Sequence, residues 1–268
     1  MHNVSSQKFK DMSYVELMAF LDEVNRPPGG KESIRQIVQT CFIVKDSRVL
    51  DIGCNTGYCS FEIAHLAKCR VVGIDISPAM INAAKKFQHE DPLGKLIEFK
   101  VGDVMNLPFK NNVFDVVISG GSTAFINDKK KALTECKRVV KPWGFIADIN
   151  FFYKTRPPSN LLRKLNNLMD INIQPWNINY WLNLYDGCNL ERYFIYTNKV
   201  RRVNKAEIKN YCSEMIKKKK LSESNKKELL KRLFSIMSLF NQNHKYLAYS
   251  VSILRKRPIE EQISLFGA

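Results

Sequence analysis

The sequence predicts a doubly wound α/β fold, in which parallel strands alternate with helices. From residue 47 to about 150, short apolar segments alternate with segments of helical spacing. The apolar segments are apolar on both faces, as expected for parallel strands that helices cover on both sides. The predicted strands are 48–52, 70–75, 97–101, 113–119 and 144–149, with two more at 190–196 and 246–254, and the helices between the first five are 58–67, 78–89 and 129–140.

Helical patterns flank this alternating region. The first forty residues predict two helices, and the first of them begins at the capping box Ser13-x-x-Glu16. Two amphipathic helices are expected to begin at Asn204-x-x-Glu207 and Asn225-x-x-Glu228, between the last two strands. We expect one compact domain with an N-terminal helical cap (1–45), a core (46–150) and a remainder (151–268) that carries insertions at 151–188 and 200–244.

Composition favours a globular, cytoplasmic protein. The 268 residues are 45% hydrophobic, which is enough to bury a full core. No segment approaches the roughly 18 consecutive apolar residues of a membrane span, and the first residues lack the apolar run of a signal peptide. The seven cysteines are odd in number and form no C-x-x-C pair, so we expect neither a disulfide framework nor a metal site.

The positive charge is concentrated in the second half of the chain. Of the formal net charge of +16, residues 1–150 contribute +3, from 20 basic and 17 acidic residues. Residues 151–268 contribute +13, from 22 basic and 9 acidic residues. The C-terminal part is therefore expected to attract an anionic substrate or partner.

Segment 51–57 (DIGCNTG) follows a predicted strand and precedes a helix, an arrangement that brings backbone amides close to a ligand. It fails the G-x-G-x-x-G pattern of NAD sites, because Asn55 and Tyr58 occupy the second and third glycine positions. Asp51 would repel a pyrophosphate but could pair with an ammonium group.

Two further segments carry acids at strand ends. Asp75 ends segment 71–75 (VVGID), where a doubly wound fold presents a carboxylate to ribose hydroxyls. Asp103 follows Gly102 directly after the next strand, and segment 114–119 (FDVVIS) ends at Ser119.

In these four motifs, their order and their spacing, the chain resembles the class I S-adenosylmethionine-dependent methyltransferases, particularly the branch with ubiquinone, menaquinone and natural-product methyltransferases. The resemblance covers about residues 30–150 and implies a Rossmann-like seven-stranded sheet that ends in an antiparallel strand pair. It implies S-adenosyl-L-methionine as the cofactor. The implied contacts are Asp51, Gly53, Asn55 and Gly57 to the methionine portion, Asp75 to the ribose, Ile76, Asp103 and Val104 to the adenine, and Ser119 in the methyl channel. Asn55 departs from the family's usual glycine, although asparagine also tolerates unusual backbone angles.

Several residues keep two interpretations. Loop 25–30 is either a helix connector or a cofactor-proximal loop, with Gly30 in it and Arg26 facing the methionine carboxylate. Tyr14 either covers the cofactor or lies in the core. The aromatic residues of 176–185 either line a substrate pocket or pack the insertion. His244 is more readily structural than a general base, and Asp115 is expected to orient the fourth strand.

The leading hypothesis is a methyltransferase for a small, anionic acceptor, which works mainly by alignment and exclusion of water, so that no catalytic residue is assigned. The alternative is an RNA or peptide methyltransferase that docks through the basic C-terminal part. The third hypothesis is a cofactor-binding module without enzymatic activity. Segment 119–122 (SGGS) lacks the Asn/Asp-Pro-Pro-aromatic signature of enzymes that methylate amino groups of nucleic-acid bases. This absence favours the small-molecule hypothesis over the RNA hypothesis.

Overall fold

The computed structural model describes residues 9, 11–23 and 25–258. The chain divides into two compact units. One unit comprises residues 25–151, 178–198 and 249–268 and contains most of the sheet, whereas the other comprises 1–24, 152–177 and 199–248 and is mainly helical.

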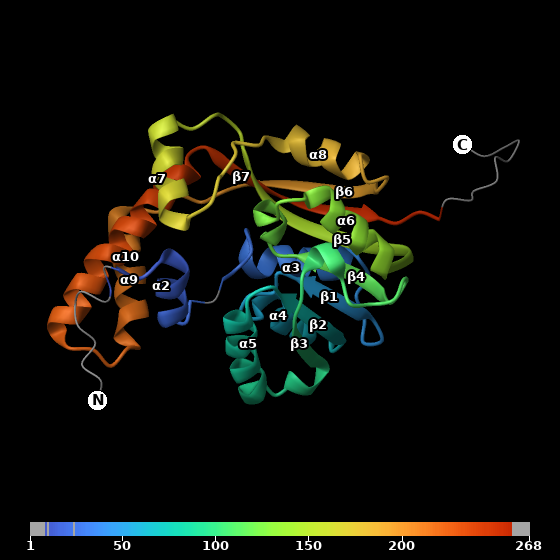
Figure 1. The fold of residues 1–268 in the computed structure, drawn as a ribbon, viewed down its shortest axis with the longest axis horizontal. Helices are drawn as coiled ribbons and strands as arrows, with labels where there is room; N and C mark the ends of the chain where they lie inside the picture. Colours follow the sequence, from blue (N-terminus) through green and yellow to red (C-terminus); the bar gives the residue numbers. More distant parts are fainter. Residues whose placement is uncertain (1–8, 10, 24, 259–268) are drawn as a thin grey trace, which may run out of the picture. The chain divides into compact units, whose positions relative to one another are not determined.

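A seven-stranded sheet runs through the described part of the chain in the order β3-β2-β1-β4-β5-β7-β6 (Figure 1). The neighbours β1 and β2, β2 and β3, β1 and β4, and β4 and β5 pair in parallel. Strand β7 is antiparallel, as the final strand pair predicted, so the expected α/β methyltransferase-type sheet is confirmed. The strands are β1 (Arg48–Ile52), β2 (Arg70–Asp75), β3 (Ile97–Val101), β4 (Phe114–Ser119), β5 (Val140–Tyr153), β6 (Glu191–Lys199) and β7 (Leu247–Arg255).

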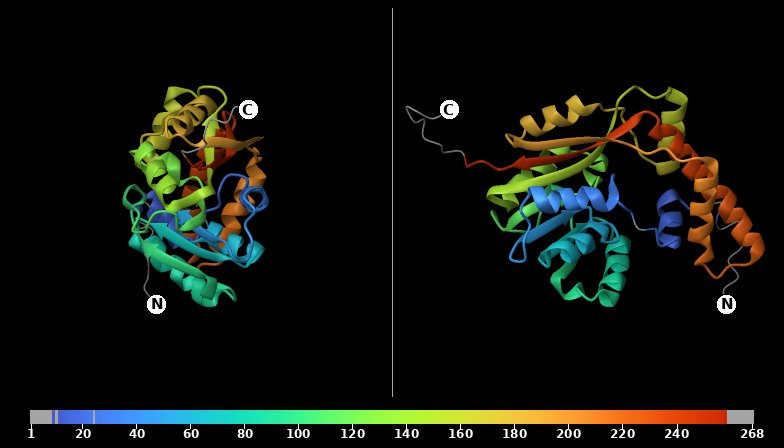
Figure 2. Two further views of the ribbon diagram at one scale, coloured as in Figure 1. Left: turned by 90° about the vertical axis from the view of Figure 1, so that its right-hand side faces the viewer. Right: turned by 180° about the vertical axis from the view of Figure 1, so that it is seen from behind.

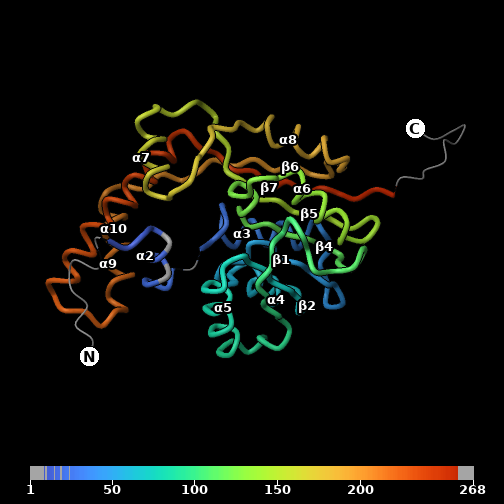
Figure 3. Tube along the Cα trace, viewed as in Figure 1, coloured from blue at the N-terminus to red at the C-terminus, as the bar shows by residue number. Residues whose placement is uncertain are grey.

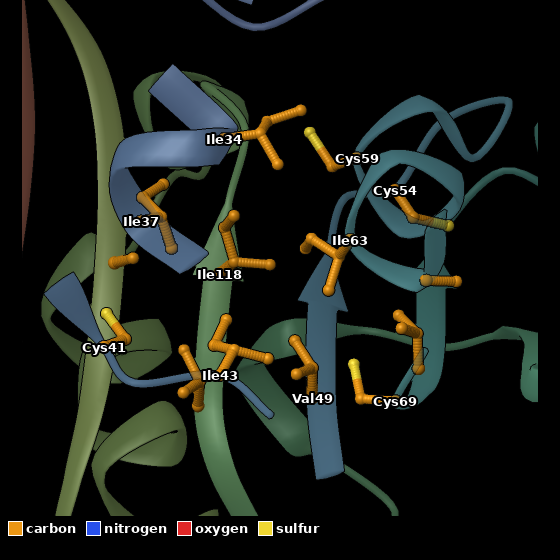
Figure 4. Close-up of a cluster of buried hydrophobic side chains, with 14 of the residues drawn as sticks. Ile34, Ile37, Cys41, Ile43, Val49, Cys54, Cys59, Ile63, Cys69 and Ile118 are labelled. Carbon is orange, nitrogen blue, oxygen red and sulfur yellow. The ribbon is translucent and has the colours of Figure 1, made fainter. Parts of the chain in front are cut away.

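Helices cover both faces of the sheet (Figure 2). On one face, α3 (Gly30–Thr40), α4 (Tyr58–Ala67) and α5 (Pro78–Glu90) pack through a continuous apolar cluster. Ile34 and Ile37 of α3 lie beside Ile63 of α4, over Val49 and Ile118 of the central strands (Figure 4). On the other face lie α6 (Lys129–Val139) and α8 (Ile178–Asp186). Because both faces are buried, the sequences of the central strands are continuously apolar.

Strand β5 is longer than predicted, because the expected turn at 141–144 lies inside it. The pairing with β4 shifts between Phe114 and Val116, so that several residues of β5 face a single residue of β4. Trp143 takes a left-handed φ of 64° at this irregularity. Asp115 stabilises this irregularity by accepting hydrogen bonds from Arg48 N (2.8 Å) and Lys141 Nζ (2.6 Å). This is the structural role predicted for it.

The mainly helical unit contains α2 (Tyr14–Phe20), α7 (Ser159–Met169), α9 (Lys205–Lys217) and α10 (Glu223–His244). Helices α9 and α10 run side by side along the trace (Figure 3). Buried residues of both, including Ile208 and Leu233, form an apolar cluster with Leu17 of α2. This unit therefore has a hydrophobic core of its own.

The capping boxes predicted at Ser13 and Asn204 are both present. The predicted start of the next helix at Asn225 is wrong, since α10 begins at Glu223 and its N-cap is Ser222. The Ser222 hydroxyl accepts from Asn225 N (3.4 Å), so the earlier of two suitable caps is used and the helix gains residues.

No helix among the described residues is long and apolar enough to cross a membrane. All seven cysteines are buried free thiols. Within residues 9, 11–23 and 25–258, no cluster of His, Cys, Asp and Glu could hold a metal ion.

Candidate cofactor site

The turn between β1 and α4 depends on three residues with left-handed backbone angles. Gly53 has φ 61°, Asn55 φ 51° and Gly57 φ 92°. A side chain on Gly53 would overlap Ser122, and one on Gly57 would lie 2.5 Å from the Phe99 ring. Asn55 adopts this conformation without glycine's freedom, because its Oδ1 accepts a hydrogen bond from Thr56 N (2.8 Å). The turn therefore brings bare backbone to the end of the sheet.

Asp51 lies at the end of β1 and is only 1% exposed. Its Oδ2 accepts a hydrogen bond from Ser60 Oγ of α4 (2.6 Å). Burial raises the pKa of Asp51 to about 7, and the Ser60 hydrogen bond opposes this shift only in part. A buried carboxyl with one polar partner retains capacity to accept from a cationic group at the turn.

Asp75, at the end of β2, links the turn that follows β1 to β2. Its Oδ2 accepts from Asn55 N (2.9 Å) and its Oδ1 from Ser77 N (2.9 Å). Asp75 stays partly exposed, and the neighbouring Ile76 side chain is 70% exposed. An accessible carboxylate beside an exposed aliphatic side chain suits a ribose hydroxyl pair next to a flat apolar ring.

Asp103 and Val104 lie beside Asp75 at the same edge of the sheet. The Gly102 amide, one residue earlier, donates to the Asp75 carbonyl (3.0 Å). Asp103 Oδ1 accepts from Met105 N (2.8 Å) and begins the short helix η2 (Val104–Asn106). Both predicted adenine contacts are partly exposed, as a ligand contact requires.

Loop 25–30 lies against the ends of β4 and α4. Pro27 is within 3.6 Å of the position a side chain would take at Gly120, and Pro28 is equally close to that of Gly121. The Arg26 guanidinium lies over the Tyr58 ring, 5.8 Å from its centroid, at the first residue of α4. The structure thus brings Arg26 to the glycine turn.

Within that loop, the tightly packed glycine is Gly29 rather than Gly30. Gly30 has a φ of 58° and nothing within 4 Å of where a side chain would begin. Gly29 has a φ of 78°, and a side chain there would overlap Ser33 and the Tyr249 hydroxyl. The sequence signal was the Gly-Gly pair, which does not distinguish its two members.

Tyr14 belongs to the mainly helical unit. Its ring packs edge-on against Phe240, with centroids 5.5 Å apart. Burial, with a contribution from Glu23, raises its pKa to about 12. The structure places Tyr14 against that unit's apolar cluster, and a cofactor contact stays a prediction.

Comparison with known proteins agrees with this geometry. Residues 50–147 match a family described as a methyltransferase domain. A demethylmenaquinone methyltransferase of Desulfitobacterium hafniense is 32% identical over 125 residues, which cover 46% of this chain and 49% of that protein. The crystal structure of MccD protein superimposes with a TM-score of 0.76 at 25% identity and covers 87% of this chain and all of that one. A phosphoethanolamine N-methyltransferase of Haemonchus contortus, solved with S-adenosyl-L-methionine, gives a TM-score of 0.69 at 18% identity, covering 96% of this chain and 61% of that one.

Residues 50–147 belong to a methyltransferase-domain family, in agreement with the predicted resemblance to the class I S-adenosylmethionine-dependent methyltransferases. The predicted family, enzyme class and cofactor are confirmed. The alignment spans only about half the length of the menaquinone relative, so the acceptor and the partners of this methyltransferase are matters for proposal.

The predicted methyl-channel residue, Ser119, is 2% exposed, and its hydroxyl belongs to a buried polar network. Ser119 Oγ lies 3.0 Å from Ser122 Oγ and 2.9 Å from Thr123 Oγ1, and Thr123 Oγ1 lies 2.8 Å from Asp148 Oδ1. Asp148 Oδ2 accepts from the Tyr185 hydroxyl (2.9 Å). A role for Ser119 in the methyl channel stays a prediction.

Sequence reasoning missed most of this network. The signal was present, because Asp148 and Asn150 on β5 and Ser250 and Ser252 on β7 recur at every second position of otherwise apolar strands. That alternation places all four side chains on one face of the sheet. All four are fully buried.

The structure supports the packing interpretation for two of the aromatic residues of 176–185, and a substrate pocket stays a prediction. Trp181 and Tyr185 of α8 are fully buried, and Trp181 Nε1 donates to the Phe151 carbonyl (3.1 Å), so both pack the helix onto the sheet. Tyr180 stays partly exposed and meets Trp181 edge-on at 5.3 Å. His244 is partly buried, and burial lowers its pKa.

Proposed function

We propose that this methyltransferase transfers the methyl group of S-adenosyl-L-methionine to a small, anionic acceptor by in-line displacement. Binding of the cofactor is supported above all by the hydrogen bond from Asn55 N to the Asp75 carboxylate. This bond joins the β1–α4 turn to the end of β2. This bond gathers the motif acids at the carboxyl edge of the sheet, where doubly wound folds bind their ligands.

In this proposal the site residues divide by the part of the cofactor that they hold. Asp51 and the Gly53, Asn55 and Gly57 backbone hold the methionine portion, with Arg26 toward its carboxylate. Asp75 accepts from the ribose hydroxyls. The adenine contacts are Ile76, Asp103 and Val104.

When bound, the cofactor supplies an electrophilic methyl group on a sulfonium. The protein's contribution is alignment of the acceptor with that group and exclusion of water. A general base is needed only for an acceptor that must lose a proton during transfer.

A small acceptor is supported by the names of two relatives, which describe methylation of demethylmenaquinone and of phosphoethanolamine. An anionic acceptor is supported by the net charge of +13 on residues 151–268. The same charge supports the alternative, an RNA or peptide acceptor. The two differ in salt dependence, which is steep for a nucleic acid whose phosphates are neutralised by lysines.

Calorimetric titration with S-adenosylmethionine and S-adenosylhomocysteine tests the cofactor site. We expect Asp75→Ala to weaken binding by about 100-fold, because it removes hydrogen bonds to a charged group worth about 1.5–3 kcal/mol each. Asp46→Ala, in the exposed loop before β1, is the matched control and should bind like the wild type. Equal affinities for the two variants would refute the assignment of Asp75.

Radiolabel transfer from the cofactor to a metabolite extract, bulk RNA and a peptide pool tests the acceptor class. We expect label in the anionic metabolite fraction. Label confined to RNA and lost steeply with added salt would establish the alternative instead.

A further inference from the structure

A line of buried polar groups crosses the sheet beneath α8. Trp143 N donates to the Lys256 carbonyl (2.7 Å) and Lys256 N to that of Gly144 (3.0 Å), which sets the antiparallel register of β5 and β7. Counting along both strands places Asp148 opposite Ser252. The polar groups thus form a layer on one face, which is unusual in a sheet interior and costly unless they are hydrogen-bonded.

The layer continues as a chain of contacts toward the cofactor turn. It runs from Tyr185 of α8 through β5 to the loop after β4, and it ends on the last carbonyl of β1. The successive contacts are Tyr185 OH to Asp148 Oδ2 (2.9 Å), Asp148 Oδ1 to Thr123 Oγ1 (2.8 Å), Thr123 Oγ1 to Ser119 Oγ (2.9 Å), Ser119 Oγ to Ser122 Oγ (3.0 Å), and Ser122 Oγ to the Ile52 carbonyl (2.8 Å).

Counting protons along this chain decides the state of Asp148. Between Asp148 Oδ1 and the Ile52 carbonyl there are four contacts of hydrogen-bond length. The Ile52 carbonyl only accepts, and the three hydroxyl groups of Thr123, Ser119 and Ser122 have one proton each. Three protons cannot fill four contacts. A proton on Asp148 Oδ1 completes the set, and each group then donates to the next.

The surroundings of Asp148 agree with a neutral acid. The side chain is fully buried, and no cation among the described residues forms an ion pair with it. Burial raises its pKa, and the hydrogen-bonding side chains around it, those of Thr123, Tyr185, Asn150 and Ser119, oppose this shift only in part. The titratable groups that face it are the Tyr185 hydroxyl from α8 and the Cys136 thiol from α6, and burial raises the pKa of each, so neither supplies a positive charge.

The far end of the chain meets the glycine turn. Ser122 Oγ would lie 2.6 Å from a side chain placed on Gly53, so the hydroxyl and the turn are in direct contact. Its hydrogen bond to the Ile52 carbonyl holds the residue just before Gly53. The position of Ser122 therefore sets the position of the turn.

We infer that Asp148 carries a proton in the folded protein and, through Thr123, Ser119 and Ser122, positions the Gly53 turn for the cofactor. This inference rests on the cofactor role proposed above for that turn. Asp148 acts as a positioning residue, because its carboxyl group reaches the turn only through the three hydroxyl groups.

Carbon-13 NMR of the aspartate side-chain carboxyl groups tests the proton directly. Asp148→Asn assigns the resonance by removing it. At pH 7 we expect the chemical shift of a protonated acid. The shift of a carboxylate would overturn the inference, whatever the binding results.

Affinity for S-adenosylhomocysteine tests the positioning role. Thr123→Val keeps the branched shape and removes the linking hydroxyl, so we expect about fivefold weaker binding, the size of one hydrogen bond. Thr134→Val is the matched control, since Thr134 lies exposed on α6 and donates only to the Lys130 carbonyl of its own helix. Circular dichroism of both variants confirms that they are folded.

A second pair of variants separates donor loss from lost stability. Asp148→Asn retains a donor toward Thr123, whereas Asp148→Leu has similar size and no donor. We expect Asp148→Leu to bind about fivefold more weakly than Asp148→Asn. If Thr123→Val lowers the unfolding temperature but binds as tightly as Thr134→Val, the chain is only structural and the positioning role is wrong. If the wild type itself binds neither cofactor form, the proposed function fails first, and the NMR shift still decides the state of Asp148.

Discussion

Two aspartates at the ends of neighbouring strands have opposite environments. Asp51 is 1% exposed and has one hydroxyl partner, whereas Asp75 is partly exposed and accepts from two backbone amides. Burial disfavours the ionised form of Asp51 and raises its pKa. The accessible Asp75 suits a neutral hydroxyl pair, and below about pH 7 a cationic group beside Asp51 would favour its ionised form.

This difference predicts that cofactor binding releases a proton below neutral pH. The folded pKa of Asp51, about 7, lies above its ordinary value of 3.8, so at pH 6 most of the free protein holds the proton. A bound ammonium group favours the carboxylate, so we expect release of nearly one proton at pH 6, little at pH 8, and affinity that rises with pH through about 7. Calorimetry in buffers of different ionisation enthalpy measures the release.

Asp51→Asn should abolish this release, and Asp46→Asn, at an exposed position, should leave it unchanged. The raised pKa also has a stability consequence. Because folding binds the Asp51 proton more tightly, its contribution to the free energy of unfolding falls as pH rises from about 4 to about 7. Wild-type binding at pH 6 without proton release would contradict the ammonium role.

At the residue scale, motif spacing predicted which residues gather at the sheet edge but not the network behind them. Asp75 ends β2 and Asp103 comes shortly after β3, so parallel topology brings them to one edge. Thr123, Asp148 and Tyr185 come from a loop, a strand and a helix that are distant in sequence, and only tertiary packing brings them together. Their contacts depend on how α8 lies on the sheet.

At the scale of elements, local signals predicted both bounds of β1, α4, β2 and β3, whereas the bounds of β5 were missed. The capping box at Asn204 identified the first residue of α9, because the cap is a local hydrogen-bond pair. Strand β5 extends from Val140 to Tyr153, well past the predicted 144–149, since its ends are set by pairing with β4 and β7. A pattern of apolar residues does not specify where a neighbouring strand stops.

Loop 25–30 provides a test at this scale. Gly29 and Gly30 both have left-handed backbone angles, so alanine costs each about 1 kcal/mol for the conformation alone. Only Gly29→Ala also forces overlap with Ser33 and Tyr249, which adds about 1–3 kcal/mol. We expect Gly29→Ala to lower the unfolding temperature more than Gly30→Ala and to weaken cofactor binding, because the loop carries Arg26.

Gly30→Ala is the internal control for this comparison, because it shares the backbone strain and lacks the overlap. Denaturant unfolding of both variants measures the difference. Equal destabilisation would mean that the packing of Gly29 against Ser33 and Tyr249 does not hold the loop.

For the whole molecule, the charge is as informative as the fold. Strands β1 to β4, most of β5 and the motif residues lie in residues 1–150, which have a net charge of +3, and the excess of +13 belongs to residues 151–268. The mainly helical unit takes 152–177 and 199–248 from this region, including α9 and α10. Fold and motifs predict the cofactor, whereas the basic residues lie outside every motif that the sequence offered.

The basic residues of α9 and α10 are expected to attract the acceptor. Lys205, Lys209, Lys227 and Lys231 are exposed, and changing all four to glutamine removes four charges from these helices. At about 0.3 kcal/mol per exposed charge, we expect KM for an anionic acceptor to rise about tenfold at low salt, with kcat unchanged.

The same change at the exposed residues Lys85, Lys86, Lys95 and Lys110 of the sheet-bearing unit is the matched control and should leave KM near the wild-type value. The difference between the two variants should shrink as salt is added, because screening acts on exposed charges. Equal KM values at low salt would show that the charge of the C-terminal part does not select the acceptor.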